Sequence, residues 1–374
     1  MILNYKIIRL CLFYLLIILI VVSFDLLINF FLPENIKKSI GITKNYSLKS
    51  KKFHHEIAPN INVYEFWGEK KYKVLTNQYG MRINTNNTYY DNKKNIGFMG
   101  DSFVYGSGIK FEDHFINHIK NQNNSYNYLN LGYVSYSPSI YYKKIIHFVK
   151  NENLKFDKIF LFIDTSDIQD ESLFYREDKY GNIVRKWNTD EEVKFKNFKY
   201  FFKNYLKQNS FVFKFYEIFS LNSVNEKSQA CLDKKNSIKD FKKFLDYERF
   251  GYAFNDEINS TDWAINGQIK TIKYLTKIKN FLDMNKIELL IVYYPSAIDV
   301  LEGNYNKIQS KHYNLLNSWS KKNNVTFIDT NEDFFISSDS IKNYKQNHII
   351  CDIHWNSGGH KIIAKHIISN LKNN

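Results

Sequence analysis

The chain has 374 residues and a mass of 44.7 kDa, with 44% hydrophobic and 17% aromatic residues. This content supports a sizeable core and excludes wholesale disorder and collagen-like or low-complexity fibres. A net charge of +14 suggests nucleic-acid binding, but only five of the 52 basic residues are arginine, the preferred reader of phosphates and base edges. A solvated, lysine-rich surface is therefore the favoured interpretation. Three cysteines without a C-x-x-C pair exclude a disulfide framework and a four-cysteine zinc site.

The first segment, residues 1–33, is predicted to be a membrane anchor. Leu10 to Phe24 carries no charge, and the apolar stretch resumes after Asp25 and ends before Pro33. A spanning helix needs about 20 apolar residues, a length that this run reaches if Asp25 lies near an interface. No small-residue cleavage site follows, so an uncleaved signal anchor is favoured over a cleaved signal peptide or a buried core helix. Lysines flank the segment, but they occur throughout the chain, so charge alone leaves the orientation open.

The rest of the chain predicts an α/β domain over 93–374, preceded by a polar, irregular stalk or packing arm over 34–92. Short apolar runs alternate with helical patterns, which is typical of a parallel sheet covered on both faces. The predicted strands are Ile96–Met99, Tyr126–Leu131, Lys158–Ile163, Ile287–Tyr294 and Val325–Ile328, with helices near 112–121, 138–151, 264–285, 305–322 and 361–371.

Residues 171–260 interrupt this alternation as an insertion. It begins with a predicted hairpin around 178–182 and continues as an aromatic, lysine-rich stretch that includes Trp187, Phe195, Phe198 and Tyr200. Its aromatic side chains suit either sugar stacking or core packing. A lid and a surface elaboration both remain open as interpretations.

Two ends of the chain supply residues of a nucleophilic site. Ser102 follows the first predicted strand within Gly100-Asp101-Ser102, where a glycine-flanked turn exposes a serine whose backbone N–H can help hold an oxyanion. Near the C-terminus, Asp352 and His354 are two positions apart, so in an extended segment they point to the same side. The carboxylate can then fix the imidazole tautomer while the other ring nitrogen faces the serine.

These motifs resemble the SGNH (GDSL-type) hydrolase family. Gly100-Asp101-Ser102 is similar to its first block and Asp352-x-His354-Trp355 to its last, in the two-residue spacing of relatives that O-acetylate alginate and similar polysaccharides. The stretch from Asn77 to Arg82 resembles the lead-in of bacterial members. The resemblance covers about residues 75–370 and implies a three-layer αβα sandwich with a five-stranded parallel, flavodoxin-like sheet.

The two middle blocks depart from the family pattern. The second-block glycine, whose N–H joins the oxyanion hole, is matched by Ser135, with Gly132 as the alternative. The third-block asparagine is replaced by Ser166, whose hydroxyl is a shorter donor. The resemblance thus implies an oxyanion hole of Ser102, Ser135 and Ser166. Supporting residues behind the catalytic ones are expected to be Asp101, Asp167 and Trp355.

The resemblance implies a membrane-anchored serine esterase or acyltransferase that acts on O-acyl groups, chiefly acetyl, of a glycan. The alternatives are a lipase or thioesterase of the same fold and a catalytically degenerate glycan-binding protein. No cofactor, metal or nucleic acid is expected. The expected partners are the membrane, a glycan or other acyl ester, and a membrane acyl-donor protein. The predicted location is the cytoplasmic (inner) membrane, with one span and an extracytoplasmic catalytic domain.

Overall fold

The computed structural model describes residues 2–31, 33, 46–67, 70–84, 92–186, 210, 212–213 and 251–372. By internal contacts the chain divides into two units, Met1–Tyr46 with Thr189–Glu226 and Ser47–Asn188 with Lys227–Asn374.

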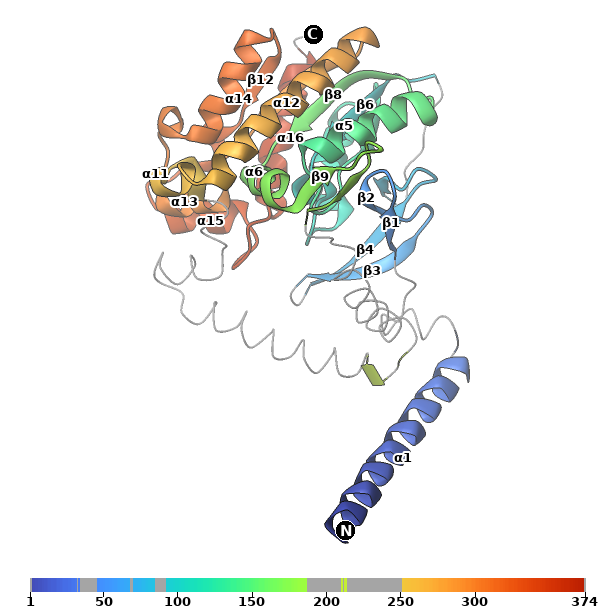
Figure 1. The fold of residues 1–374 in the computed structure, drawn as a ribbon. Helices are drawn as coiled ribbons and strands as arrows, with labels where there is room; N and C mark the ends of the chain where they lie inside the picture. Colours follow the sequence, from blue (N-terminus) through green and yellow to red (C-terminus); the bar gives the residue numbers. More distant parts are fainter. Residues whose placement is uncertain are drawn as a thin grey trace. The chain divides into compact units, whose positions relative to one another are not determined.

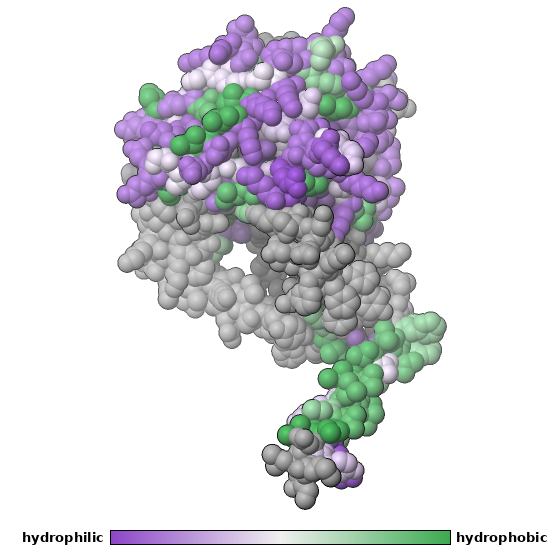
Figure 2. All heavy atoms as spheres, viewed as in Figure 1, coloured by the Kyte–Doolittle hydropathy of each residue, from purple (hydrophilic) through white to green (hydrophobic). Residues whose placement is uncertain are grey.

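In the first unit, helix α1 (Ile2–Phe31) is the main described element. Its segment Ile7–Ile28 is, among the described residues, the one helix long and apolar enough to cross a membrane by length and composition. Apolar side chains are exposed around its whole circumference, and Figure 2 shows it as almost continuously hydrophobic on the visible side. The carboxylate of Asp25, the acid within this segment, accepts a hydrogen bond from the backbone N–H of Val212 at 2.9 Å. A helix this apolar on every side suits lipid better than water.

The second unit is built on a parallel sheet of five strands: β6 (Asn95–Met99), β7 (Asn127–Asn130), β8 (Phe156–Phe162), β11 (Glu288–Tyr293) and β12 (Thr326–Asp329). Their spatial order is β7-β6-β8-β11-β12, and every neighbouring pair is parallel. This is the flavodoxin-like order that the family resemblance implies. The predicted fold class is confirmed, and each predicted strand is present within two residues of its expected ends.

Helices cover both faces of this sheet and make the three layers (Figure 1). One face carries α5 (Pro138–Ile146), α12 (Asp262–Met284) and α14 (Lys311–Lys322); the other carries α4 (Phe115–Gln122) and α16 (Ser357–Lys372). Along α12 the buried residues recur every three or four positions, which gives the stripe of an amphipathic helix. Strand residues alternate accordingly: Phe160 and Phe162 pack in the core cluster with α4 and α16, and Leu161 points to the opposite face.

The segment predicted as an irregular stalk or arm contains five short strands in its described part. The hairpin of β1 (Ser47–Ser50) and β2 (His54–Ile57) is one two-stranded sheet, and β3 (Asn62–Trp67), β4 (Lys70–Thr76) and β5 (Arg82–Ile83) form another sheet. β1, β2 and β5 have two to four residues each, too few for an alternating pattern to show. β4 does alternate, with Tyr72, Val74 and Thr76 buried, so this strand was predictable and was missed.

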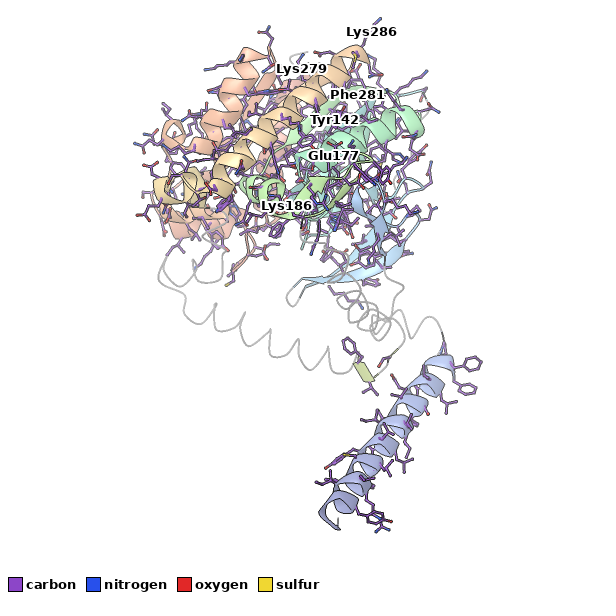
Figure 3. All side chains as sticks on the ribbon, viewed as in Figure 1. Tyr142, Glu177, Lys186, Lys279, Phe281 and Lys286 are labelled. Atoms are coloured by element: carbon purple, nitrogen blue, oxygen red, sulfur yellow. The ribbon has the colours of Figure 1, made fainter. Side chains whose placement is uncertain are left out.

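The predicted hairpin at the start of the insertion is confirmed as β9 (Tyr175–Glu177) and β10 (Ile183–Arg185). Glu177 ties it to two helices: its carboxylate pairs with Lys143 of α5 at 2.7 Å and accepts from the hydroxyl of Tyr274 of α12 at 3.3 Å. Figure 3 labels Glu177 of β9 and Tyr142 of α5. Residues 187–209, 211 and 214–250 of the insertion lie outside the described residues. They include Trp187, Phe195, Phe198 and Tyr200, and the predicted lid lies outside the described residues with them.

In the described residues outside the 171–260 insertion, four short α-helices have no counterpart among the predicted elements: α3 (Ser102–Tyr105), α6 (Thr165–Gln169), α13 (Ala297–Glu302) and α15 (Ser340–Asn347). None is long enough for an apolar period to show in the sequence. Each begins at a side-chain cap instead, which is an acid or serine accepting a backbone N–H of the first turn. The caps are Asp101, Asp164, Ser296 and Asp339.

Candidate active site

Ser102 lies at the junction between strand β6 and helix α3. The strand is buried throughout, and it ends at Gly100, where a Cβ would lie 2.4 Å from a methyl carbon of Val104. Asp101 caps the helix by accepting the backbone N–H of Phe103 at 3.0 Å. Ser102 is thus the first residue of the helix and lies half-buried at the carboxyl end of the sheet.

The end of α3 is held by Arg82, a buried residue of the small antiparallel sheet. Its guanidinium donates to the carbonyl oxygens of Tyr105 at 2.9 Å, Gly106 at 2.5 Å and Ile109 at 2.5 Å. Gly106 adopts a φ of 81°, a left-handed conformation that ends the helix. The lead-in stretch from Asn77 to Arg82 therefore anchors the turn that carries Ser102. Arg82 is thus a supporting residue of the site, although the sequence motif that contains it predicts no role for it.

Asp352 and His354 lie in a tight loop between α15 and α16. The expected extended geometry is wrong: Cys351 has a φ of 64°, and the loop closes through a hydrogen bond from the N–H of Ile349 to the carbonyl of His354 at 2.9 Å. The Tyr344 hydroxyl also stabilises the loop. It lies 2.9 Å from the carbonyl oxygen of Ile349 and 2.7 Å from that of Asp352, and it can donate to either. It accepts a hydrogen bond from the Asp352 N–H at 3.0 Å. A turn, and not a strand, brings the two side chains together.

The three side chains form one continuous hydrogen-bonded series. Nε2 of His354 lies 2.8 Å from Oγ of Ser102, and Nδ1 of the same ring lies 2.5 Å from Oδ1 of Asp352. That carboxylate oxygen also accepts the backbone N–H of His354 at 2.8 Å, which fixes the ring from its own main chain. The Ser102 hydroxyl has a second, longer acceptor in Asp101 at 3.2 Å.

The surroundings of His354 raise its pKa. Burial alone would lower the pKa of His354, but the hydrogen-bonded carboxylate of Asp352 outweighs it and leaves that pKa above its usual value. Asp101 and Asp164 act in the same direction. An imidazole that gains a proton easily next to a serine hydroxyl suits a general base.

The two further serines of the predicted oxyanion hole, Ser135 and Ser166, differ in whether they have a free hydrogen-bond donor. Ser135 follows β7, is exposed and has a φ of 55°, a conformation natural to the glycine that it replaces in the family pattern. Its N–H has no hydrogen-bond acceptor among the described residues. The alternative, Gly132, donates its N–H to the side chain of Asn130 at 3.1 Å. Of the two backbone N–H groups, that of Ser135 is therefore the one without an acceptor among the described residues.

Ser166 follows β8 as the second residue of α6. Its hydroxyl donates to the carboxylate of Asp164, and its N–H donates to the same carboxylate at 3.0 Å. A hydroxyl has one hydrogen to donate, and here Asp164 takes it. The arrangement gives no support to the Ser166 side chain as an oxyanion donor.

The residues expected to support the site are buried behind it. Asp167 accepts from the Tyr141 hydroxyl at 2.8 Å and from the Asp164 N–H at 2.8 Å, and burial together with the charges of Asp101 and Asp164 raises its pKa well above the usual range. Trp355 is buried against Phe103, with ring centroids 4.9 Å apart. Trp355 therefore packs the loop of His354 against α3, whereas Asp167 caps α6 and contacts α5. Neither side chain joins the hydrogen-bonded series.

No family model and no curated protein matches the chain. Among solved structures it is similar to a GDSL-like lipase from Bacteroides thetaiotaomicron (10% identity, TM-score 0.37, covering 76% of this chain and 91% of that one). It is also similar to a G-D-S-L family lipolytic protein from Veillonella parvula, at 12% identity and a TM-score of 0.38, covering 75% of this chain and 100% of that one. A third similar structure is the acetyl xylan esterase AlAXEase, at 14% identity and a TM-score of 0.38, covering 74% of this chain and 99% of that one. Similarity at this level assigns this chain neither an activity nor a substrate.

Proposed function

We propose that the protein is a serine ester hydrolase that works through an acyl-enzyme on Ser102. The observation that carries the proposal is the unbroken series from Asp352 through His354 to Ser102, with donor–acceptor distances of 2.5 and 2.8 Å. The nucleophile lies 252 positions before the base in the sequence, and the two meet at the carboxyl edge of the sheet, where open α/β sheets bind ligands.

The reaction follows from these contacts. Ser102 Oγ attacks the ester carbonyl while its proton passes to Nε2 of His354, and the charge on the imidazolium is balanced by Asp352. Collapse of the tetrahedral intermediate breaks the bond to the leaving alcohol, which takes the proton from His354. Water then attacks the acyl-enzyme, with His354 again accepting the proton, and the acid leaves as Ser102 is restored.

We assign the backbone N–H groups of Ser102 and Ser135 as the donors that stabilise the oxyanion of both tetrahedral intermediates. Ser166 is not included, because its hydroxyl is engaged with Asp164. Losing one oxyanion donor costs about 10²–10³ in rate in a well-studied hydrolase, so a two-donor hole predicts a slow enzyme. A slow enzyme with a long-lived acyl intermediate gives an alcohol acceptor time to compete with water.

For the substrate we propose O-acyl groups, chiefly acetyl, on a glycan outside the cytoplasm. The Asp352-x-His354 spacing resembles relatives that O-acetylate polysaccharides, and helix α1 suits a membrane anchor. Among the described cysteines, Cys351 takes part in a disulfide, a bond that persists in oxidising compartments. That bond, next to Asp352, supports an extracytoplasmic catalytic domain.

The test of catalysis is labelling of the detergent-solubilised chain by a fluorophosphonate serine probe. Wild type is expected to label and Ser102→Ala to fail, while a matched control, Ser107→Ala, labels as wild type. Ser107 is buried five residues away, and its hydroxyl has no hydrogen-bond partner among the described residues. Labelling that survives Ser102→Ala would overturn the proposal.

The substrate class is tested with esters of different acyl length and with sugar acceptors. Ser102-dependent release of acetate from acetylated oligosaccharide supports the glycan assignment, and acetyl movement onto an added oligosaccharide identifies transfer. Preference for long acyl chains would favour a lipase or thioesterase instead. Glycan binding without any Ser102-dependent turnover would favour a catalytically degenerate glycan-binding protein.

A further inference from the structure

The loop that carries Ser135 is a four-residue turn held from outside the parallel sheet. The turn spans residues 133–136 and is closed by a hydrogen bond from the N–H of Tyr136 to the carbonyl oxygen of Tyr133 at 3.3 Å. Ser135, the third residue of the turn, has a φ of 55°. Positive φ at the third position is the signature of a type II turn, which glycine or asparagine normally fills. Serine is strained there, so the turn needs support from its surroundings.

Two side chains from other elements supply that support. Nε2 of His55, on strand β2, lies 2.7 Å from the carbonyl oxygen of Val134. The hydroxyl of Tyr175, on β9, donates to the carbonyl oxygen of Ser135 at 2.8 Å. The peptide groups on both sides of Ser135 are therefore each held by one hydrogen bond.

The first of these bonds decides where the Ser135 N–H points. A trans peptide is planar, so the carbonyl of Val134 and the N–H of Ser135 point in opposite directions. Type I and type II turns differ by a half-turn of this central peptide. A donor on the carbonyl side therefore keeps the N–H on the other side, away from His55.

The proton positions along this contact are determined by chemistry. A carbonyl oxygen only accepts, so Nε2 of His55 must carry the hydrogen. Nδ1 of His55 lies 2.9 Å from Nδ1 of His54. Burial lowers the pKa of His55, and burial with the neighbouring His55 lowers the pKa of His54 to about 4, so both rings are neutral near pH 7. His54 then donates from Nδ1 to His55, and His55 donates from Nε2 to Val134.

The ring of His55 has little room to turn away. Its centroid is 5.2 Å from that of Tyr136, 5.7 Å from Tyr133 and 6.5 Å from Tyr175, the last pair stacked at 16°. Tyr133 also packs edge-on against Tyr105 of α3 at 5.2 Å, so the supported turn lies against the helix that begins with Ser102. The N-terminal hairpin is thereby joined to the edge of the proposed active site.

We propose that His55, oriented by His54, is a positioning residue that holds the Val134–Ser135 peptide so that the Ser135 N–H faces the oxyanion. This inference rests on the proposed hydrolase function and names a residue outside the four sequence blocks of the family resemblance. His55 acts through the peptide and does not touch the substrate.

The experiment compares kcat and KM for a short-chain ester in His55→Leu and His55→Gln of the full chain. A glutamine amide can replace the Nε2 donor, whereas leucine cannot. His55→Leu is expected to lower kcat by about 10–10² with KM within threefold, because an oxyanion donor acts in the transition state. His55→Gln is expected to recover most of that loss. The control is His147→Leu. His147 lies outside the turn and pairs with Glu152, so the kcat of this variant is expected to stay near that of wild type.

The outcomes separate this inference from the function on which it rests. If Ser102→Ala abolishes turnover while His55→Leu keeps wild-type kcat, the positioning role fails and the hydrolase stands. If His55→Leu loses kcat only in proportion to its folded fraction, measured by near-ultraviolet circular dichroism, or if His55→Gln rescues nothing, the role is structural and the inference is overturned. Turnover that survives Ser102→Ala removes the proposed function itself.

Discussion

At the scale of single residues, the site depends on how one carboxylate sets the state of one imidazole. Asp352 accepts both the ring and the backbone N–H of His354, which selects the tautomer with Nε2 free to accept from Ser102. It also raises the pKa of His354 against the effect of burial. Tautomer and pKa are separate properties, and replacing Asp352 changes both.

Asp352→Asn is expected to lower kcat by roughly 10³–10⁴, since an amide stabilises the wrong tautomer and no longer balances the imidazolium. The active form needs neutral His354, so activity falls as the pH drops through the pKa of that group. With the carboxylate gone, burial dominates, the pKa falls, and the acid limb of kcat/KM moves to lower pH. A profile measured from pH 4 to 9 checks this; an acid limb that stays in place would contradict the assignment of His354 as the base.

Ser135 carries a strain that a substitution can relieve. A left-handed conformation costs a residue with a side chain roughly 1–2 kcal/mol, and glycine avoids that cost while gaining entropy when unfolded. Ser135→Gly is therefore expected to stabilise the fold by about 0.5–1 kcal/mol. Its N–H remains, so activity is expected to persist. Urea unfolding tests this against Ser125→Gly, at a position without positive φ, which is expected to be neutral or destabilising.

At the scale of elements, the nucleophile's short helix depends on a side chain from a different sheet. α3 has four residues, too few to be stable alone, and Arg82 satisfies three carbonyl oxygens at and beyond its end. The small antiparallel sheet of the N-terminal arm therefore has a direct role in placing Ser102. The same arm supports Ser135 through the β1–β2 hairpin.

Arg82→Met is expected to destabilise the protein by roughly 3–5 kcal/mol, because buried carbonyls lose a charged donor. The remaining folded protein is expected to label more slowly with a fluorophosphonate, since the turn that presents Ser102 is loosened. The exposed Arg176→Met is the matched control and should lie within about 0.5 kcal/mol of wild type. Equal stability of the two variants in denaturant unfolding would show that the Arg82 contacts contribute little.

At the scale of the whole molecule, the N-terminal helix bears on where the proposed chemistry takes place, because it is long and apolar enough to cross a membrane. Its apolar surface on every side suits a membrane span, and the disulfide at Cys351 suits an oxidising compartment. An enzyme on that side would meet glycans during or after export. The lysines that follow Pro33 argue for the opposite orientation under the positive-inside rule, so orientation needs its own experiment.

Fusions at the C-terminus test the orientation directly. We expect alkaline phosphatase, which needs an oxidising compartment, to be active as a fusion, and a cytoplasmic fluorescent reporter to stay dark. We also expect the full chain to remain in the membrane pellet after carbonate extraction, because a span of about 20 apolar residues is not removed by pH or salt. The reverse reporter pattern would place the catalytic unit in the cytoplasm.

Much of the architecture could be read from the sequence because it rests on local pattern. Continuous apolar strands and longer amphipathic helices predict the parallel sheet and its covering layers, and the motif residues Ser102, Asp352 and His354 stand out by their chemistry and position. The short helices α6, α13 and α15 could not be predicted by periodicity, because a capped helix of one or two turns shows no period. The polar hairpin β1–β2 was likewise invisible to an apolar pattern.

What only the tertiary structure decided is which polar atoms meet. The sequence predicts a hydroxyl at Ser166, but only the fold shows that Asp164 takes its hydrogen. It predicts an aspartate and a histidine two positions apart, but a turn tied by Tyr344, not an extended segment, brings them together. His55 and Arg82 belong to two separate small sheets, and only the fold shows that His55 contacts the turn of Ser135 and that Arg82 contacts the end of α3. Hydrophobic burial follows residue type and spacing and is therefore visible in a sequence, whereas hydrogen bonds depend on the position and direction of each donor and acceptor, which only the folded chain fixes.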